Sequence, residues 1–85
     1  MVYTANVELR NYLEKKGFKL IQNGTINTLY FTHLENKVQI KIDRVKLSIN
    51  FFDSSGYKVK VVKSIKEGEL NNFIEKGGFI NEKKI

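Results

Sequence analysis

Lysine and aromatic side chains are the residues in this chain whose type and spacing could do chemistry. The chain has 85 residues, with 15 Lys and Arg against 9 Asp and Glu, which gives a formal charge of +6. Lysine ammonium groups neutralise phosphates and aromatic rings stack on bases, a combination typical of sheets that bind single-stranded nucleic acids. Only Arg10 and Arg44 could make the bidentate contacts that guanine and phosphate usually receive. Binding of this kind should therefore be electrostatic and weakly selective for sequence.

The remaining polar residues give little support to acid–base, nucleophilic or metal chemistry. His33 is the only histidine and the chain has no cysteine, so a zinc site would need carboxylate ligands, which is uncommon. Asp43 and Asp53 fall at expected turns, and Glu67 and Glu69 fall at a helix start, where negative charge is favourable. We therefore expect a protein that is not an enzyme and that has no metal site and no cofactor.

Two helices are predicted to hold the strands that carry these side chains. The spacing of apolar residues predicts a first helix over residues 6–16, with Thr4 or Asn6 as its cap and Gly17 at its end. Ser64 and Glu67 have the spacing of a capping box, which predicts a second helix ending at the Gly77-Gly78 pair.

Four turn signals divide the segment between the helices into five strands. They are Asn23-Gly24, Glu35-Asn36, Asp43-Arg44 and the Asp-Ser-Ser-Gly sequence at 53–56. The implied registers place Phe18 opposite Leu29, Phe31 opposite Ile40, Ile42 opposite Val45, and Phe51 opposite Val59. Odd-numbered side chains from Val45 to Val61 then face the same way as even-numbered ones from Val38 to Ile42, forming one apolar face.

These elements predict an α+β fold with an N-terminal helix, a five-stranded antiparallel meander and a C-terminal helix. Both helices should cover the apolar face of the sheet. Residues 1–80 are expected to form a single domain, because so short a chain supports only one core, and residues 81–85 a frayed C-terminal tail. A helix followed by five short strands also fits a small Sm- or SH3-like barrel, so closure of the meander is the alternative.

The second face of the predicted sheet is lysine-rich and contains two aromatic rings, and we expect it to bind DNA or RNA. The candidate residues are Lys19, Tyr30, Lys37, Lys41, Lys46, Phe52, Lys58 and Lys60. In the predicted register Lys41 lies opposite Lys46, a like-charge pair that an anion would stabilise. The same pattern also fits an ordinary solvated sheet face, whose lysines only keep the protein soluble.

A protein-interaction or inhibitory accessory module is the alternative function. Ile21 and Ile26 lie near the tip of the first predicted hairpin, and Val62 adds an apolar residue on another strand. These residues, or an exposed edge strand, could form the contact of a homodimer.

The sequence pattern predicts neither a signal peptide nor a membrane span. Its first ten residues lack the basic start and apolar run of a signal sequence, and no stretch approaches about 18 apolar residues. With no cysteine for disulfides, these features predict a cytoplasmic protein without a membrane partner.

Overall fold

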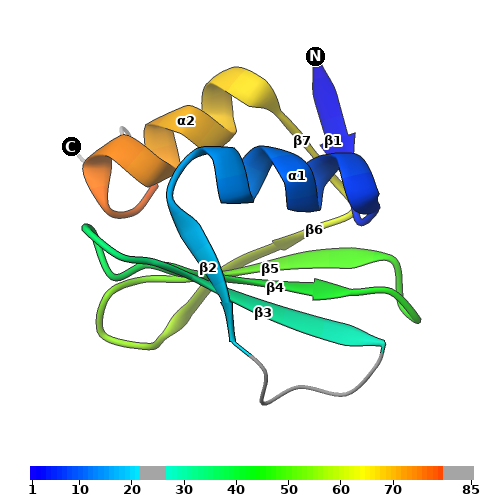
Figure 1. Cartoon of the computed structure of the whole chain (residues 1–85), viewed down its shortest axis with the longest axis horizontal. Helices are drawn as coiled ribbons and strands as arrows, with labels where there is room; N and C mark the ends of the chain where they lie inside the picture. The colour runs from blue at the N-terminus through cyan, green and yellow to red at the C-terminus, as the bar shows by residue number, and fades with distance from the viewer. Residues whose placement is uncertain (22–26, 80–85) are drawn as a thin grey trace, which may run out of the picture.

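The computed structural model describes residues 1–21 and 27–79, which form two helices and seven strands (Figure 1). In chain order the elements are β1 (Val2–Thr4), α1 (Val7–Lys15), β2 (Phe18–Ile21), β3 (Thr28–His33), β4 (Gln39–Asp43), β5 (Ser48–Phe52), β6 (Lys58–Val62), β7 (Ser64–Lys66) and α2 (Glu67–Lys76). The predicted tail at 81–85 lies outside the described residues. None of the described helices has the length and apolar character needed to cross a membrane.

Strands β2 to β6 form one antiparallel sheet in their chain order, so the predicted five-stranded meander is confirmed. The strands at its two ends, β2 and β6, do not pair with each other among the described residues, and the barrel alternative is therefore wrong. A second sheet of two short strands was not predicted. It joins β1 to β7, with Tyr3 opposite Ile65 and both side chains buried.

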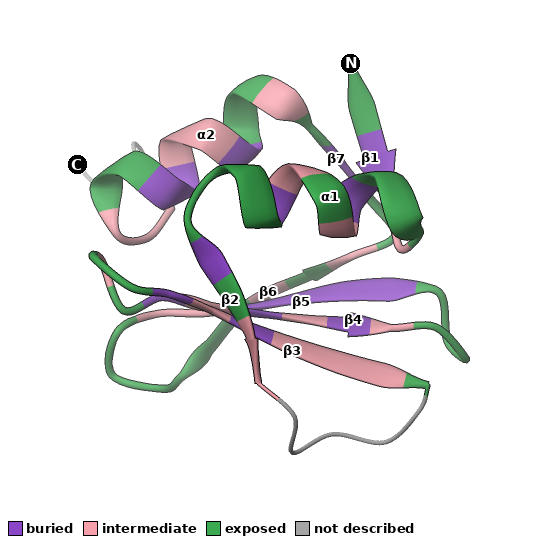
Figure 2. Ribbon diagram, in the orientation of Figure 1, coloured by how far each residue is buried: buried purple, intermediate pink, exposed green. Residues whose placement is uncertain are grey.

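Both helices lie on the same side of the five-stranded sheet, as predicted, and the core fills the space between them and the sheet (Figures 1 and 2). From the helices and the small sheet, the buried apolar residues are Tyr3, Leu9, Leu13, Ile65, Leu70, Phe73 and Ile74. From the five-stranded sheet and its loops they are Phe18, Phe31, Val38, Ile40, Ile42, Ile49 and Phe51. Burial of this apolar surface is the main favourable term in folding.

Helix α1 has the ends that its sequence predicts. The side-chain oxygen of Asn6 accepts hydrogen bonds from the backbone N–H groups of Glu8 and Leu9, at 3.1 and 3.3 Å. Gly17 follows the helix with a φ of 102°, a left-handed conformation that favours glycine. Asn6 rather than Thr4 is therefore the cap.

The predicted capping box of the second helix is wrong. Ser64 belongs to β7, where it lies opposite Thr4, and α2 begins only at Glu67 after a cap without a side-chain hydrogen bond. Residues 64–66 pair with β1 through backbone hydrogen bonds, and this pairing keeps the segment extended as a strand instead of letting it begin the helix. The predicted end of the helix is confirmed, because Gly77 is left-handed with a φ of 73°.

The first hairpin has a register four residues away from the prediction. Phe18 lies opposite His33 instead of Leu29, and the Asn23-Gly24 turn falls outside the described residues. A shift of four is even, so every side chain of β2 keeps its predicted face. The observed register lets the His33 ring contact Phe18 edge-on, at 5.0 Å between ring centres, and places His33 Nε2 at 3.0 Å from the carbonyl oxygen of Lys16.

The second predicted register is confirmed, but the third is wrong by four residues. Phe31 lies opposite Ile40 as expected. Ile42, however, lies opposite Ile49, so Val45 is exposed in a loop of residues 44–47. The Asp43 carboxylate stabilises this longer loop by accepting hydrogen bonds from two of its backbone N–H groups, those of residues 45 and 46.

The turn at 53–56 forms as predicted, but the strand after it contains a bulge. Phe52 lies opposite Lys58, whereas Phe51 lies opposite Lys60, so Val59 is an extra residue in β6. One extra residue reverses the face of every side chain beyond it. The predicted inward position of Val61 is therefore wrong.

The bulge can be tested through the stability of two variants at neighbouring valines. Regular alternation would bury Val61 and expose Val62, whereas the bulge does the opposite. Val62 lies opposite Ile49 and packs against the core, whereas Val61 is 51% exposed. Val62→Lys should lower the free energy of unfolding by about 1–3 kcal/mol, because a charge replaces a packed apolar group. Val61→Lys should change it by less than about 0.5 kcal/mol. Urea unfolding of both variants measures the difference, and a larger loss for Val61→Lys would contradict the bulged register.

Candidate nucleic-acid interface

The side of the five-stranded sheet turned away from α1 and α2, here called the open face, carries two complete rows of side chains. The first row runs from β2 to β6 as Lys19, Thr32, Gln39, Phe52 and Lys58. The second runs in the same order as Ile21, Tyr30, Lys41, Asn50 and Val61. Each row therefore brings an aromatic ring and at least one lysine to the same line across the sheet.

Each aromatic ring on the open face has a lysine from the neighbouring strand above it. The ammonium nitrogen of Lys41 lies 5.8 Å from the centre of the Tyr30 ring, and that of Lys58 lies 5.9 Å from the centre of the Phe52 ring. Both rings are half-buried, so each is held by the sheet and still reachable. A ring beside a cation is the arrangement that a base and its adjacent phosphate can contact together.

Two polar residues on the open face of β5 are buried, which alternation alone does not predict. Asn50 is 5% exposed and lies in its row between the side chains of Lys41 and Val61. Its amide nitrogen lies 3.3 Å from the Ser48 hydroxyl oxygen and 3.4 Å from the carbonyl oxygen of Lys41. These bonds satisfy the buried amide and fix the strand beneath Lys41.

Three of the predicted lysines lie away from the open face. Because of the bulge at Val59, Lys60 faces the helices, where its ammonium group lies 3.4 Å from a Glu69 carboxylate oxygen and 4.5 Å from the centre of the Phe79 ring. Lys37 and Lys46 belong to loops, since the β3–β4 and β4–β5 connections are longer than two residues. The predicted Lys41–Lys46 pair is also wrong, because Lys41 lies opposite Asn50.

Asp43 is the acidic residue on the open face of the described strands. Hydrogen bonds from the backbone N–H groups of Lys46 and Val45 hold the pKa of its carboxyl below the usual value, and the nearby Lys41 and Lys46 charges add to this. Asp43 is therefore ionised at neutral pH and partly offsets Lys19, Lys41 and Lys58. Three positive charges and one negative charge leave these strands with a net charge of +2 on this face.

The residues of the alternative protein-interaction patch are not brought together. Ile21 lies on the open face of β2, whereas Val62 lies on the helix side of β6, at the other edge of the sheet. Ile26 lies outside the described residues. The patch therefore reduces to Ile21, which is half-buried opposite Tyr30.

His33 has a structural position beside the C-terminal end of α1. It is 6% exposed, its Nε2 lies at hydrogen-bond distance from the Lys16 carbonyl oxygen, and its Nδ1 accepts a bond from the Asn36 N–H. Both ring nitrogens of His33 are therefore occupied by backbone groups. Within residues 1–21 and 27–79, no three histidine, aspartate or glutamate side chains gather into a group that could hold a metal ion.

The chain was compared with protein families, curated proteins and solved structures. No family model, no curated protein and no solved structure matches the chain.

Proposed function

We propose that the protein binds single-stranded nucleic acid on the open face of its five-stranded sheet. The observation that carries this proposal is the pairing of Tyr30 with Lys41 and of Phe52 with Lys58. Both pairs lie on the face of the sheet that neither helix covers (Figure 1). A base can stack on an aromatic side chain only when it is not paired and stacked in a duplex. A lysine next to the ring can neutralise the adjacent phosphate. The surface therefore suits a single strand better than a double helix.

The two rows assign a role to each element of the surface. Tyr30 and Phe52 stack on two bases, and Lys19, Lys41 and Lys58 bind the phosphates around them. Thr32 and Gln39 lie between Lys19 and Phe52 in the first row, where they can exchange hydrogen bonds with base edges. Lysine neutralises charge without reading a base pattern bidentately, so binding is weakly selective for sequence.

Removal of either stacking ring tests the proposal directly. Tyr30→Ala and Phe52→Ala should each weaken binding of a single-stranded oligothymidylate of about 12 nucleotides by about 1–3 kcal/mol, or roughly 5- to 150-fold. Fluorescence anisotropy of a labelled oligonucleotide measures the affinity.

Tyr57→Ala provides the matched control, because Tyr57 is 73% exposed and lies in the turn before β6, outside both rows. Its affinity should equal that of the unchanged protein. Equal affinities for all three variants, or tighter binding of a duplex of the same length, would exclude stacking on this face.

Edge strand β6 supports a second candidate function, an association of two copies of the chain. Val59 and Val61 are 45% and 51% exposed on a strand that, within residues 1–21 and 27–79, pairs with β5 alone. An uncovered edge with exposed valines can add a strand from another molecule. The neighbouring Lys58 opposes this association through its charge.

Sedimentation velocity tests the second candidate. If β6 pairs between copies, the mass should double with rising concentration, and Val59→Lys with Val61→Lys should restore a monomer. The exposed apolar residue Val7, on α1, supplies the control Val7→Lys, which should leave the dimer unchanged. A monomeric mass at every concentration would discard this candidate.

A further inference from the structure

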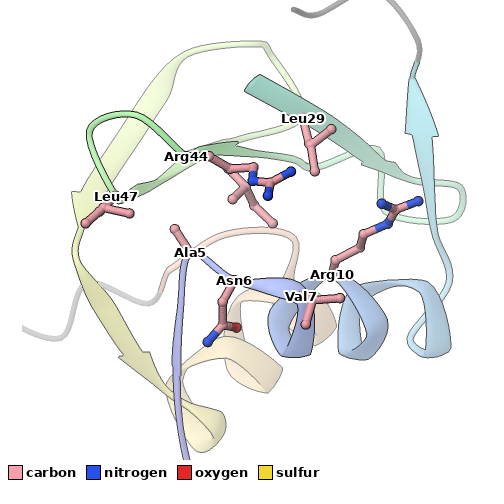
Figure 3. A pocket seen from close by; sticks show the side chains of 8 residues that line it. Ala5, Asn6, Val7, Arg10, Leu29, Arg44 and Leu47 are labelled. Atoms are coloured by element: carbon pink, nitrogen blue, oxygen red, sulfur yellow. The ribbon is translucent and has the colours of Figure 1, made fainter. Parts of the chain in front are cut away.

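A separate pocket of about 430 Å³ lies on the helix side of the sheet, where α1 begins (Figure 3). Ala5, Asn6, Val7 and Arg10 line it from the start of α1, and Leu29, Ile42, Arg44 and Leu47 line it from the sheet and the loop at 44–47. Its size is within the usual range of small-molecule sites, about 300–1,000 Å³. It shares no residue with the two rows of the open face.

Most of the wall of this pocket is apolar. Leu29 and Ile42 lie opposite each other on β3 and β4 and form the floor at the edge of the core. Leu47 approaches from the loop, where its φ of 55° places it in the left-handed region that side chains other than glycine rarely adopt. Strain of this kind persists only where the surrounding structure requires it, and here it places an apolar side chain at the pocket.

The two arginines of the whole chain, Arg10 and Arg44, both border this pocket (Figure 3). The Nε atom of Arg10 lies 3.6 Å from a Glu14 carboxylate oxygen, which leaves its two terminal nitrogens free of that contact. Arg44 makes no ion pair within the described part of the chain. An apolar pocket bordered by two guanidinium groups is complementary to a ligand with an apolar body and a single anionic head.

We propose that this pocket binds a small amphipathic carboxylate, such as a medium-chain fatty acid. The carboxylate accepts hydrogen bonds from Arg44 and from the terminal nitrogens of Arg10, since the planar guanidinium matches a carboxylate in two parallel bonds. The acyl chain lies against Leu29, Ile42 and Leu47. The partial positive charge at the start of α1 adds to the attraction, although Asn6 already accepts bonds from its first N–H groups.

The experiment titrates the full chain with decanoate and follows the methyl resonances of Leu29, Ile42 and Leu47 by NMR. These resonances should shift and saturate with decanoate. Decanol, which lacks the charge, and acetate, which lacks the apolar body, should each bind at least about tenfold more weakly, because the pocket uses both parts of the ligand. Vesicles of anionic lipid should not shift these resonances, since the head and chain must enter the pocket together.

Variants that remove one positive charge distinguish specific binding in the pocket from attraction of the ligand to the net positive charge of the protein. Arg44→Gln and Arg10→Gln should each weaken decanoate binding at least about fivefold, because each removes charge-assisted bonds. Lys15→Gln is the control, since Lys15 is an exposed cation of the same helix and does not line the pocket. Its affinity should be unchanged.

Several results would overturn this inference. They are the absence of saturable shifts, equal affinity for decanol, shifts on the open face instead of the pocket, binding only to vesicles, or equal losses for Lys15→Gln and Arg44→Gln. Oligonucleotide affinity should be the same for Arg44→Gln and the unchanged protein, so failure of the pocket and failure of the nucleic-acid interface are distinguishable.

Discussion

The packing of two helices on one face of the five-stranded sheet is the constraint on which the rest of the structure depends. Phe31, Ile40 and Phe51 are fully buried in the middle of that face, and the Phe51 ring meets the Phe73 ring of α2 edge-on at 5.0 Å between centres. Successive side chains of a strand point to opposite faces. Burial of one set therefore forces the next residues along these strands, including Lys41 and Phe52, onto the uncovered side.

The bulge at Val59 is the place where this alternation fails, and it decides which lysines the open face can use. Beyond the bulge Val62 joins the core, and Lys60 lies between Glu69 and the Phe79 ring. Without the extra residue, Lys60 would stand on the open face and Val62 would leave the core. The bulge therefore exchanges one cation of the open face for a contact with the C-terminal part of the chain.

Local chemistry in the sequence predicts several elements well because each depends on residues close together in the chain. Asn6 caps α1 by accepting hydrogen bonds from the backbone N–H groups of Glu8 and Leu9. Gly77 ends α2 in a left-handed conformation. The carboxylate of Asp53 similarly fixes its turn by accepting bonds from the N–H groups of Ser55 and Tyr57. None of these signals requires knowledge of distant residues.

The missed features depend on contacts between segments that are far apart or on the exact length of a loop. The pairing of Tyr3 with Ile65 joins segments from opposite ends of the chain, and no periodicity in three-residue strands reveals it. The first and third hairpin registers differ from the prediction by four residues, an even number, so the strand residues keep their predicted faces although their partners differ. The single-residue bulge at Val59 reverses the faces of the β6 residues that follow it. Lys60 therefore points to the helix side instead of the open face, and Val62 packs against the core.

Five of the eight predicted binding residues share the open face, because strand alternation before the bulge is regular. Lys19, Tyr30, Lys41, Phe52 and Lys58 all lie before the bulge or on the side of it where the predicted register holds. The burial of Asn50 and Ser48 could not be predicted, because it depends on the side chains that flank them across the sheet. The pocket between Arg10 and Arg44 was equally hidden, since it forms only when α1 and the loop at 44–47 meet.

The salt dependence of oligonucleotide binding tests most directly whether the open face is the binding surface. Three lysines that each neutralise a phosphate of a single strand should give a slope of about −2 for the logarithm of affinity against the logarithm of salt concentration. Replacing Lys41 and Lys58 together by glutamine should reduce the magnitude of this slope by about 1.4, at about 0.7 per phosphate. Replacing Lys15 and Lys66, exposed lysines outside the five-stranded sheet, removes the same charge and should leave the slope unchanged. An equal reduction for both pairs would show that net charge alone drives binding, and would contradict a defined interface on the open face.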